Sequence, residues 1–600
     1  MRGETSTVRF CFSVALGLLL LASLGTVARA EDSLGSMAQD PNQWVMPGRD
    51  YALTRYSPLK QINADNAKDL KVAWTMSTGA LRGHEGNPLV IGDMMYFESA
   101  FPNYVYAVNL SDPGRIVWKF VPHQDSYAPS VACCDVVNRG PAYGDGKLIV
   151  NTLDGHVYAL DAKNGRIVWA VQNAEPKLGQ TMTNAPLVAR DKVVVGVSGG
   201  EYGVRGYVTA YDLGSGKRVW RAYSEGPDSD LIFDPEKTIE GATQGPVGRN
   251  SSLKTWRGEA WKLGGGTTWG WFSYDPKLNL FYYGSGNPGT WNPSQRPGDN
   301  KWSMTIFARD LDTGAARWVY QMTPHDGWDY DGINEMVLAD LDVNGSNVPT
   351  LVHFDRNGFA YVVNRENGKL IAAHKYDPTV NWATEVNMET GRPQVNPAYM
   401  TKQDVNVKGI CPSAQGDKDQ QPVSYDPETK LFYAPLNHLC MDYQGFAVKY
   451  KAGFPFVGAI VNMFPAEGGN RGRFIAFDAV AGQPKWEIKD MFQDWGGALT
   501  TAGGLAFYGT LDGWLRAVDI NTGKVLYQFH CPSGIIGNPM TFMHNGKQYV
   551  AILSGVGGWS AIGLALPELA EPTAGLGAVG LTASLKDYTS LGGTLLVFSL

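Results

Sequence analysis

The feature that most constrains this 600-residue chain is a repeated turn. A short β-rich stretch ends in Asp or Asn, a Gly follows four residues later, and an aromatic residue follows eight residues later. The full pattern occurs at Asp161, Gly165 and Trp169; at Asp212, Gly216 and Trp220; at Asp310, Gly314 and Trp318; and at Asp478, Gly482 and Trp486. Variants occur at Asp519, Gly523 and Tyr527; at Asn109, Gly114 and Trp118, one residue longer; and at Asn364 and Gly368, with Ala372 at the aromatic position.

This repeat is typical of a β-propeller. Each unit reads as a β-hairpin, and a Trp ring is large enough to fill the gap between stacked sheets. Two of the intervals between units, 98 and 114 residues, are about twice the others and each hold one further strand pair, at residues 269–275 and 423–434. A propeller closes such a set into a ring, whereas a stack of sandwiches does not explain an aromatic residue at one fixed offset. The sequence therefore predicts an all-β, eight-bladed β-propeller with tryptophan-docking motifs.

Composition supports a compact β protein and excludes several classes of function. The chain has 71 Gly, and 12% of its residues are aromatic, which excludes intrinsic disorder. The formal net charge is −7, and Lys and Arg occur in no cluster larger than a pair. A nucleic-acid partner and a polybasic membrane anchor both require concentrated basic residues, so we expect neither.

The N-terminus has the pattern of a secretory signal peptide. Arg2 and Arg9 precede an apolar run over residues 10–24, and Ala28 and Ala30 provide the small residues of a cleavage site. The apolar run is too short for a transmembrane span, although an uncleaved anchor is the alternative. We predict a signal peptide over residues 1–30, one propeller domain over residues 31–600, no transmembrane segment, and export to the periplasm, where disulfides persist.

Two stretches are too long for loops within a blade, residues 224–266 and 377–419. Long excursions from a rigid scaffold are usually functional lids or caps. The last nine residues, 592–600, read as a strand that closes the ring.

Five cysteines remain after cleavage, so at least one thiol is free. Cys411 and Cys440 are most simply a structural bridge in an oxidising compartment. Cys133 and Cys134 are neighbours, with Cα atoms about 3.8 Å apart, below the usual disulfide range of about 4.4–6.8 Å. From the residues alone, a bond between them and two cysteines that are reduced or paired elsewhere are equally favoured. The role of Cys531 stays open.

An Asp-x-Asp motif indicates a cation site. If residues 328–332 are extended, Asp329 and Asp331 point to the same side and can converge, and two close carboxylates repel each other unless a cation lies between them. Glu201 and Asn287 lie in glycine-rich stretches that let the backbone approach a ligand closely. This all-oxygen set is typical of a hard cation rather than zinc or copper. The alternative is a solvated acidic turn, the commoner fate of such a motif.

Taken together, the docking repeats, the vicinal cysteines and the oxygen ligands resemble those of the quinoprotein alcohol dehydrogenases, eight-bladed propellers that carry pyrroloquinoline quinone (PQQ). The resemblance covers essentially the whole mature chain and is greatest to the lanthanide-dependent (Xox-type) methanol dehydrogenases. It implies that Cys133 and Cys134 form a ring-shaped disulfide over one face of the quinone, with Trp269 stacked on the other face.

The resemblance also implies the residues of the site. Asp329 matches the general base, and Arg356 matches the arginine beside the reactive carbonyl oxygen of the quinone. The other residues implied to contact the quinone are Glu85, Arg139, Thr183, Ser198, Gly199, Gly200, Thr267, Asp419 and Trp495. The implied metal ligands are Glu201, Asn287, Asp329 and Asp331.

Asp331 separates two subtypes. The calcium-dependent methanol enzymes resemble this sequence but carry Ala at this place. An added carboxylate suits a trivalent ion, because the extra positive charge offsets a third anion in the ligand shell. We therefore expect a lanthanide of the La³⁺/Ce³⁺ class, with Ca²⁺ as the alternative cofactor; in a further alternative Asp331 merely binds nearby backbone.

The function implied by the resemblance is oxidation of methanol and other short primary alcohols to the aldehyde. The metal would polarise the quinone carbonyl, Asp329 would take the alcohol proton as hydride moves to the quinone, and Arg356 would stabilise the growing charge. Electrons would then pass to a cytochrome c, and the enzyme would be a homodimer. The alternatives are a PQQ ethanol dehydrogenase using Ca²⁺ or a lanthanide and, more distantly, a non-catalytic propeller scaffold.

Overall fold

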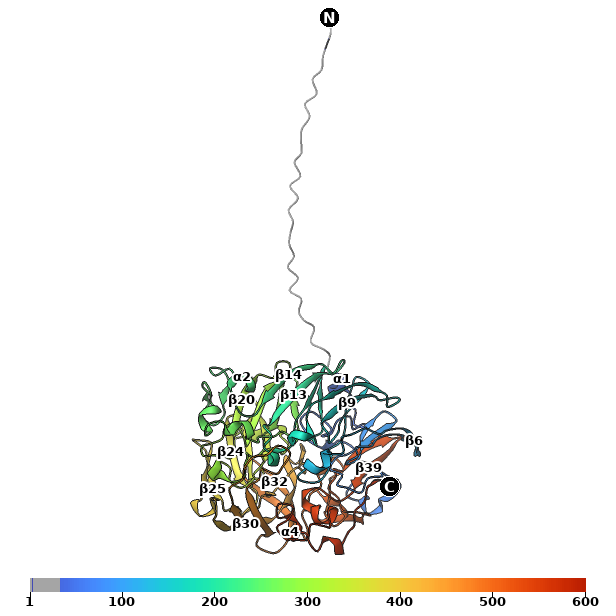
Figure 1. Cartoon of the computed structure of the whole chain (residues 1–600). Helices are drawn as coiled ribbons and strands as arrows, with labels where there is room; N and C mark the ends of the chain where they lie inside the picture. The colour runs from blue at the N-terminus through green and yellow to red at the C-terminus, as the bar shows by residue number, and fades with distance from the viewer. Residues whose placement is uncertain (1–2, 4–32) are drawn as a thin grey trace. The chain divides into compact units, whose positions relative to one another are not determined.

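The computed structural model describes residue 3 and residues 33–600, and these are built mainly from antiparallel strands. From residue 33 onward they belong to one compact unit. Within this described part, eight sheets each contain four antiparallel strands. In Figure 1 the colour passes from blue to red from one sheet to the next around the unit, which is the predicted propeller. Apart from residue 3, the predicted signal peptide lies outside the described residues.

Each of the first four blades is a meander of four consecutive strands. Their bounds are, in blade 1, β3 (Leu89–Ile91), β4 (Met94–Glu98), β5 (Val105–Asn109) and β6 (Asp112–Phe120); in blade 2, β7 (Ala142–Gly144), β8 (Lys147–Asn151), β9 (His156–Asp161) and β10 (Ile167–Gln172); in blade 3, β11 (Leu187–Ala189), β12 (Lys192–Val195), β13 (Tyr207–Asp212) and β14 (Arg218–Tyr223); and in blade 4, β17 (Ser273–Asp275), β18 (Leu280–Gly284), β19 (Thr305–Asp310) and β20 (Ala316–Gln321).

The other four blades follow the same plan, with an insertion in blade 6 and strands from both ends of the chain in blade 8. Their bounds are, in blade 5, β21 (Val337–Val343), β22 (Ser346–Phe354), β23 (Phe359–Asn364) and β24 (Leu370–Lys375); in blade 6, β28 (Ser424–Asp426), β29 (Leu431–Asn437), β32 (Gly472–Asp478) and β33 (Gln483–Asp490); in blade 7, β34 (Leu499–Thr501), β35 (Leu505–Gly509), β36 (Trp514–Asp519) and β37 (Val525–His530); and in blade 8, β38 (Met540–His544), β39 (Lys547–Ser554), β40 (Thr594–Ser599) and β2 (Lys71–Ser77).

The aromatic residues of the repeat join successive blades. The Trp118 ring lies against Gly165 of the next blade, where a Cβ would come within 2.6 Å of the ring. Its Nε1 donates to the carbonyl oxygen of Ala162 at 3.0 Å. The glycine has a φ of 70°, which favours Gly in any case. The same two contacts recur for Trp169 with Gly216 and Leu213, Trp220 with Gly314 and Leu311, Trp318 with Gly368 and Arg365, and Trp486 with Gly523 and Ile520.

Blade 5, which has Ala372 at the aromatic position, docks through another side chain. His374, two residues later, lies against Gly482 so closely that a Cβ on this glycine would clash with the imidazole. Its Nε2 lies 3.1 Å from the carbonyl oxygen of Val480. The imidazole thus makes both contacts of a docking Trp with a smaller ring.

The ring is closed by strands from the two ends of the chain. β40 pairs antiparallel with β39 and with β2, from Lys71 opposite Ser599 to Ser77 opposite Thr594. The prediction that the last nine residues provide a closing strand is therefore confirmed. The N-terminal segment also contributes β1 (Tyr56–Ser57), which lies parallel to β34.

Both predicted excursions carry secondary structure of their own. The first contains α2 (Asp228–Leu231), β15 (Ile239–Glu240), β16 (Gly245–Pro246), η5 (Leu253–Thr255) and η6 (Ala260–Leu263), and β15 extends blade 4 by pairing with β20. The second contains β25 (Ala383–Asn387), β26 (Arg392–Val395), η8 (Pro397–Tyr399) and β27 (Asn406–Ile410). β27 pairs with the blade 6 insertion, β30 (Leu439–Gly445) and β31 (Ala459–Pro465). The predicted Cys411–Cys440 disulfide links β30 to the residue after β27.

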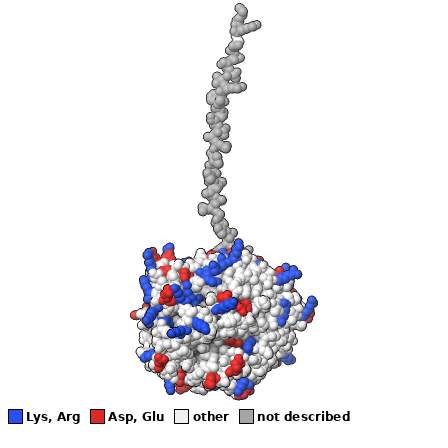
Figure 2. All heavy atoms as spheres, in the orientation of Figure 1, with Lys and Arg blue, Asp and Glu red and all other residues white. Residues whose placement is uncertain are grey.

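The sequence analysis missed a third excursion, between β39 and β40. It contains η9 (Trp559–Ala561), α3 (Ile562–Ala565), α4 (Ala578–Leu581) and η10 (Leu585–Asp587). The remaining short helices are α1 (Ser33–Met37), η1 (Ala67–Asp69), η2 (Ala128–Val131), η3 (Pro176–Leu178), η4 (Gly200–Tyr202) and η7 (Pro293–Gln295). None of the helices in the described residues is long and apolar enough to cross a membrane. On the face shown in Figure 2, basic and acidic side chains are interspersed.

Candidate functional site

A cleft gathers most of the predicted site residues. It encloses about 670 Å³ of empty space, part of which is open solvent at its mouth. Seven of the eight connections between successive blades contribute to it, because each runs from the outer strand of one blade to the inner strand of the next and so returns to the centre of the ring. The predicted residues that line it are Glu85, Cys133, Cys134, Arg139, Thr183, Ser198, Gly199, Glu201, Trp269, Asp329, Asp331, Arg356, Asp419 and Trp495.

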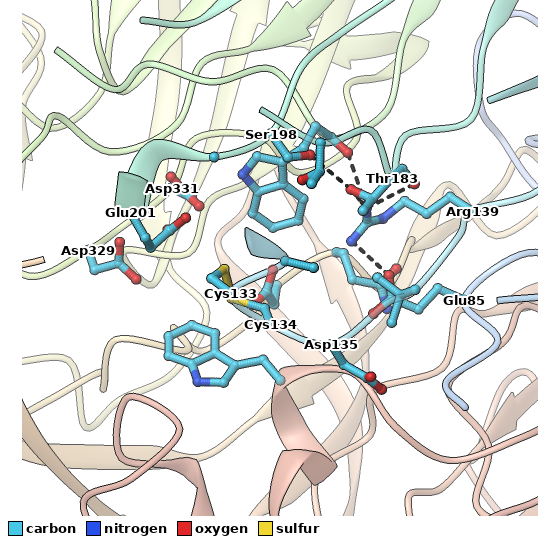
Figure 3. Close-up of a pocket in the computed structure, with 18 of the residues that line it drawn as sticks. Glu85, Cys133, Cys134, Asp135, Arg139, Thr183, Ser198, Glu201, Asp329 and Asp331 are labelled. Carbon is cyan, nitrogen blue, oxygen red and sulfur yellow. Dashed lines mark hydrogen bonds and ion pairs between the residues drawn. A yellow bond between two sulfur atoms is a disulfide. The ribbon is translucent and has the colours of Figure 1, made fainter. Parts of the chain in front are cut away.

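An acidic cluster forms one end of the cleft, where Figure 3 shows Glu201, Asp329 and Asp331 together. Arg356, between β22 and β23, lies among these carboxylates. Its Nη1 donates to Asp329 Oδ2 at 3.1 Å, and its Nη2 donates to Asp419 Oδ1 at 2.9 Å. The same Nη2 lies 3.4 Å from Asp331 Oδ2. One guanidinium therefore faces three buried aspartates.

The cluster carries more negative charge than the protein compensates. Burial, followed by repulsion from Asp331, raises the pKa of Glu201 to about 7. Burial also raises the pKa of Asp331 to about 6, against the attraction of Arg356, and raises that of Asp329 well above its ordinary value. Together with Asp419, four carboxylates surround one guanidinium, so the fully ionised cluster has a net charge of −3. A cation of high charge would offset this excess.

Asn287 completes this end of the cleft. Its backbone N–H donates to Asp331 Oδ1. Its side-chain Oδ1 is buried without a hydrogen-bond partner and lies beside Gly200, where a Cβ would come within 3.3 Å of it. Thr267 Oγ1 lies at 3.4 Å from the same Cβ position, so Gly200, Thr267 and Asn287 adjoin one another directly behind the cleft. The structure thus brings together all the residues that the sequence predicted for a cation.

The geometric reason given for the Asp-x-Asp motif was wrong. Residues 328–332 are not a strand but part of the connection between β20 and β21, and Asp329 has a φ of 68°. The two carboxylates meet because Arg356 contacts both of them, not because of strand alternation. In the described part of the chain, no three Asp, Glu, His or Cys side chains are already gathered at metal-ligand spacing.

The opposite end of the cleft is a hydrogen-bonded polar group. Arg139 Nη2 lies 2.7 Å from Glu85 Oε2, and its Nη1 donates to Thr183 Oγ1 at 3.0 Å. Thr183 Oγ1 is 3.1 Å from Ser198 Oγ, and Figure 3 shows this network facing the acidic cluster across the disulfide. Burial raises the pKa of Glu85 to about 7 despite the attraction of Arg139.

The walls between the two ends are flat and nonpolar. Cys133 and Cys134 are joined by a disulfide and line the cleft, which decides between the two alternatives left open for these cysteines. The Trp269 ring also lines it, and Arg139 Cζ lies 4.8 Å from the centre of that ring. The loop of Gly199, which has a φ of 117°, and the indole of Trp495 also line the cleft.

Two aromatic residues of the cleft were missed by the sequence analysis, Trp291 and Trp559. Their rings are 6.3 Å apart, and the Trp559 ring centre lies 5.5 Å from Arg356 Cζ. Trp559 enters from the third excursion, which the repeat pattern does not mark. Neither Trp stands at the docking offset, but most of the 18 Trp of the chain do not either, so the sequence carried no signal that could have identified these two.

Comparison with known proteins gives one consistent result. Residues 44–390 and 491–550 match the family model described as PQQ glucose/ethanol/alcohol dehydrogenase, beta-propeller domain. The chain belongs to the PQQ-dependent alcohol dehydrogenases. The predicted family and fold class are thereby confirmed.

Several members of this PQQ-dependent family resemble the chain along nearly its full length. It is 58% identical over 597 residues, 98% of each chain, to the lanthanide-dependent methanol dehydrogenase of Methylorubrum extorquens. It is 51% identical over 608 residues to methanol dehydrogenase [cytochrome c] subunit 1 of the same organism, covering 99% of this chain and 97% of the relative. A solved structure, a europium-containing methanol dehydrogenase, superposes with a TM-score of 0.92 at 55% identity, covering 94% of this chain and all of that one.

The cleft fits the cofactor of this family. PQQ is a flat, oxygen-rich anion, and the cleft offers flat walls together with polar groups at both ends. Arg139 Nε and Arg356 Nε are buried donors without partners, which suits an oxygen-rich anion. Asn287 Oδ1 is a buried acceptor without a partner, which suits a hard cation.

Proposed function

We propose that this chain is a PQQ- and lanthanide-dependent methanol dehydrogenase that oxidises methanol and other short primary alcohols to the aldehyde. The observation that carries the proposal is the position of Asp331, which adds a third close aspartate to the single guanidinium of Arg356. A trivalent cation matches the net charge of −3 in this cluster, whereas Ca²⁺ leaves one negative charge uncompensated. Glu201, Asn287, Asp329 and Asp331 would hold the cation.

The quinone would lie between the disulfide and the Trp269 ring. Glu85, Arg139, Thr183 and Ser198 would bind its polar groups at one end. At the other end it would meet Arg356 and Asp419, with Gly199, Gly200, Thr267 and Trp495 completing its surroundings. When bound, the quinone supplies the acceptor for the hydride of the alcohol C–H bond, and the cation supplies the Lewis acid that polarises the quinone carbonyl.

Asp329 provides the base. Arg356 binds its Oδ2, which leaves Oδ1 as a buried acceptor without a partner. The hydroxyl proton of the alcohol would pass to this Oδ1 as the C–H bond breaks, so that the alcohol loses one proton and one hydride and becomes an aldehyde. Arg356, whose pKa is raised by its three aspartates in spite of burial, stays charged and stabilises negative charge that develops beside it.

The electrons would leave to a cytochrome c, the acceptor named for the subunit 1 relatives. We further propose that the protein acts in the periplasm after removal of residues 1–30 and that it forms a homodimer. N-terminal sequencing of protein from the periplasmic fraction tests the location and the cleavage. Light scattering on the mature protein tests the homodimer.

Metal content and activity together test the proposal. We expect protein matured with PQQ and La³⁺ to contain one lanthanide per chain and to oxidise methanol with an artificial dye as acceptor. Because Asp331→Ala removes a ligand charge, the variant should lose stoichiometric La³⁺ and at least about 100-fold in activity. Asp340→Ala removes an aspartate that is paired with an arginine at the surface, and this control should retain both.

Two results would count against the assignment. Equal metal content and activity of Asp331→Ala and wild type would show that Asp331 is no ligand, and full activity with Ca²⁺ would place the chain with the calcium enzymes. A higher kcat/KM for ethanol than for methanol would instead identify an ethanol dehydrogenase on the same scaffold.

A further inference from the structure

Asp135 is a buried carboxylate to which the proposed chemistry gives no role. It directly follows Cys134, lines the cleft, and is 6% exposed. Its φ of 72° is uncommon for a residue other than Gly, and it forms an isolated bridge with Cys133. The disulfide and Asp135 are therefore parts of one tight turn. Figure 3 shows the Asp135 side chain directed away from the disulfide, toward the C-terminal part of the chain.

The side chain of Asp135 binds the segment that carries Trp559. The backbone N–H of Gly558 donates to Asp135 Oδ2 at 2.9 Å. The contact is close, because a Cβ on Gly557 would lie 2.5 Å from the same oxygen. Trp559 follows directly, with its ring near Arg356 and its Nε1 bound to the carbonyl oxygen of Gly575 at 2.8 Å. One hydrogen bond thus connects the disulfide wall of the cleft with its tryptophan wall.

A third segment meets the same carboxylate. Arg82, in the connection between β2 and β3, has its Nε 3.8 Å from Asp135 Oδ1. Its Nη1 donates to the carbonyl oxygen of Ala565, the last residue of α3. Arg82 therefore contacts the disulfide turn and the third excursion at the same time. Backbone contacts also join these segments, namely the bridge between His84 and Asn138 and the hydrogen bond from the His84 N–H to the carbonyl oxygen of Gly555. The relative position of the disulfide turn and the Trp559 segment therefore depends on Asp135 and Arg82 together with these backbone contacts.

We propose that Asp135 is a positioning residue that holds the disulfide turn against the Trp559 segment and so limits the length of alcohol that the cleft admits. The inference rests on the proposed alcohol oxidation. The disulfide and Trp559 border the same space beside Asp329 and Arg356. A pocket with fixed walls discriminates by one methylene by roughly 10- to 200-fold, and this discrimination falls when a wall can move.

The test is steady-state kinetics of holoenzyme loaded with PQQ and La³⁺, with methanol and 1-butanol as substrates. For Asp135→Ala we expect the ratio of kcat/KM for 1-butanol to that for methanol to rise about fivefold or more. Asp135→Asn keeps an acceptor for the Gly558 N–H and should stay within about twofold of wild type. A loss of stability or of cofactor alone would lower the rates with both alcohols in proportion and leave the ratio unchanged.

Asp275→Ala is the matched control. Asp275 is also a buried aspartate that accepts from a backbone N–H and pairs with an arginine, at 2.9 Å from Lys277 N and 2.8 Å from Arg365 Nε, but it lies outside the cleft. For Asp275→Ala, the ratio of kcat/KM for 1-butanol to that for methanol should equal the wild-type ratio. If Asp135→Ala does not fold, Arg82→Gln replaces it, because Arg82 is half-buried and its variant should also raise the ratio.

The outcomes separate the two proposals. An unchanged ratio in Asp135→Ala, or in Arg82→Gln where the first variant does not fold, overturns the role of Asp135. A ratio that rises equally in Asp275→Ala overturns it as well, because the effect is then not specific to the cleft. Wild-type holoenzyme that oxidises neither alcohol refutes the proposed function itself, whatever the variants do.

Discussion

At the scale of single residues, a buried ion triad fixes the start of the second excursion. Asp377 Oδ2 lies 2.6 Å from His438 Nδ1 and accepts from Arg473 Nη1 at 2.9 Å. Burial alone would raise the pKa of Asp377, but the hydrogen bond of His438 and the charge of Arg473 outweigh it and lower the pKa to about 2. The pKa of His438 is raised above its ordinary value, since Asp377 outweighs its own burial.

These shifts predict a pH-dependent stability. A depressed carboxyl pKa contributes stability above the unfolded pKa of about 4, and this stability is lost as the pH falls toward about 2. At pH 7 we expect Asp377→Asn to lower the free energy of unfolding by about 2 kcal/mol, and the difference from wild type to shrink between pH 4 and pH 3. Denaturant unfolding at a series of pH values measures it.

His438 adds a second pH range in which stability changes, and there stability falls as the pH rises. Its raised pKa contributes stability that is complete below about pH 6.5 and declines as the pH rises through the folded pKa. Asp340→Asn, at an exposed ion pair, is the control and should change the free energy of unfolding by less than about 1 kcal/mol. A constant difference between Asp377→Asn and wild type from pH 7 to pH 3 would contradict the assignment.

Residue types predicted the chemistry of the site better than its geometry. Asp329 and Asp331 were recognised from their carboxylates, but their convergence depends on Arg356, which is distant in sequence, and on a left-handed backbone that the motif does not reveal. Whether Cys133 and Cys134 bond to each other was undecided without the resemblance. Trp559 was not predictable, because its place is set by tertiary contacts of an excursion without a repeat.

At the scale of elements, the docking contacts show which part of the repeat matters. The glycine of each turn provides the flat surface, and the ring of the preceding blade fills it. His374 shows that the contact tolerates a change of ring and a shift of two residues, because a flat ring with one N–H or ring nitrogen suffices. The eight predicted blades are consistent with the eight four-stranded sheets of the described chain even where the aromatic residue was missing, since the spacing of the turns was retained.

The docking rings should stabilise the fold in proportion to their size. We expect Trp220→Ala to lower the free energy of unfolding by about 3–5 kcal/mol, because it removes a buried ring and the hydrogen bond to Leu311. His374→Ala should cost about 1–2 kcal/mol, because the imidazole is smaller and only partly buried. Urea unfolding followed by tryptophan fluorescence and circular dichroism gives both values.

Trp514→Ala provides the comparison for these variants. Trp514 lies at the start of β36, partly exposed, and contacts His530 of its own blade instead of a glycine of the next. Its replacement should cost less than that of Trp220. If all three variants lose the same free energy of unfolding, the docking contacts contribute no more to stability than another aromatic contact does. Stability would then not explain why the repeat has an aromatic residue at a fixed offset.

At the scale of the whole molecule, blade 8 depends on both ends of the chain. Among the described strands, β2 has β40 as its neighbour in the sheet and no other strand beyond it. The third excursion, with Trp559, is held between β39 and β40. Ring closure and the tryptophan wall of the cleft are therefore provided by one stretch of chain.

Truncation tests this dependence. A chain that ends at Gly593 lacks β40, so β2 and β39 both lose their partner and expose free edges. We expect it to be insoluble or, where soluble, to bind neither PQQ nor La³⁺, as measured by gel filtration, absorbance and metal analysis. A chain that lacks only Leu600, which is exposed and lies beyond β40, should behave like wild type. Normal cofactor content in the chain that ends at Gly593 would show that the ring does not need its closing strand.

The pairing of β2 with β40 also sets the order of folding events. Lys71 and Ser599 are opposite each other although they are separated by more than five hundred residues. A contact over such a span carries a large loop-closure cost and forms slowly unless the intervening chain is already compact. During synthesis the first strand of this pair emerges long before its partner exists. The N-terminal strand must therefore wait with an unpaired edge, in need of protection against association with other chains, until the last seven residues have been made.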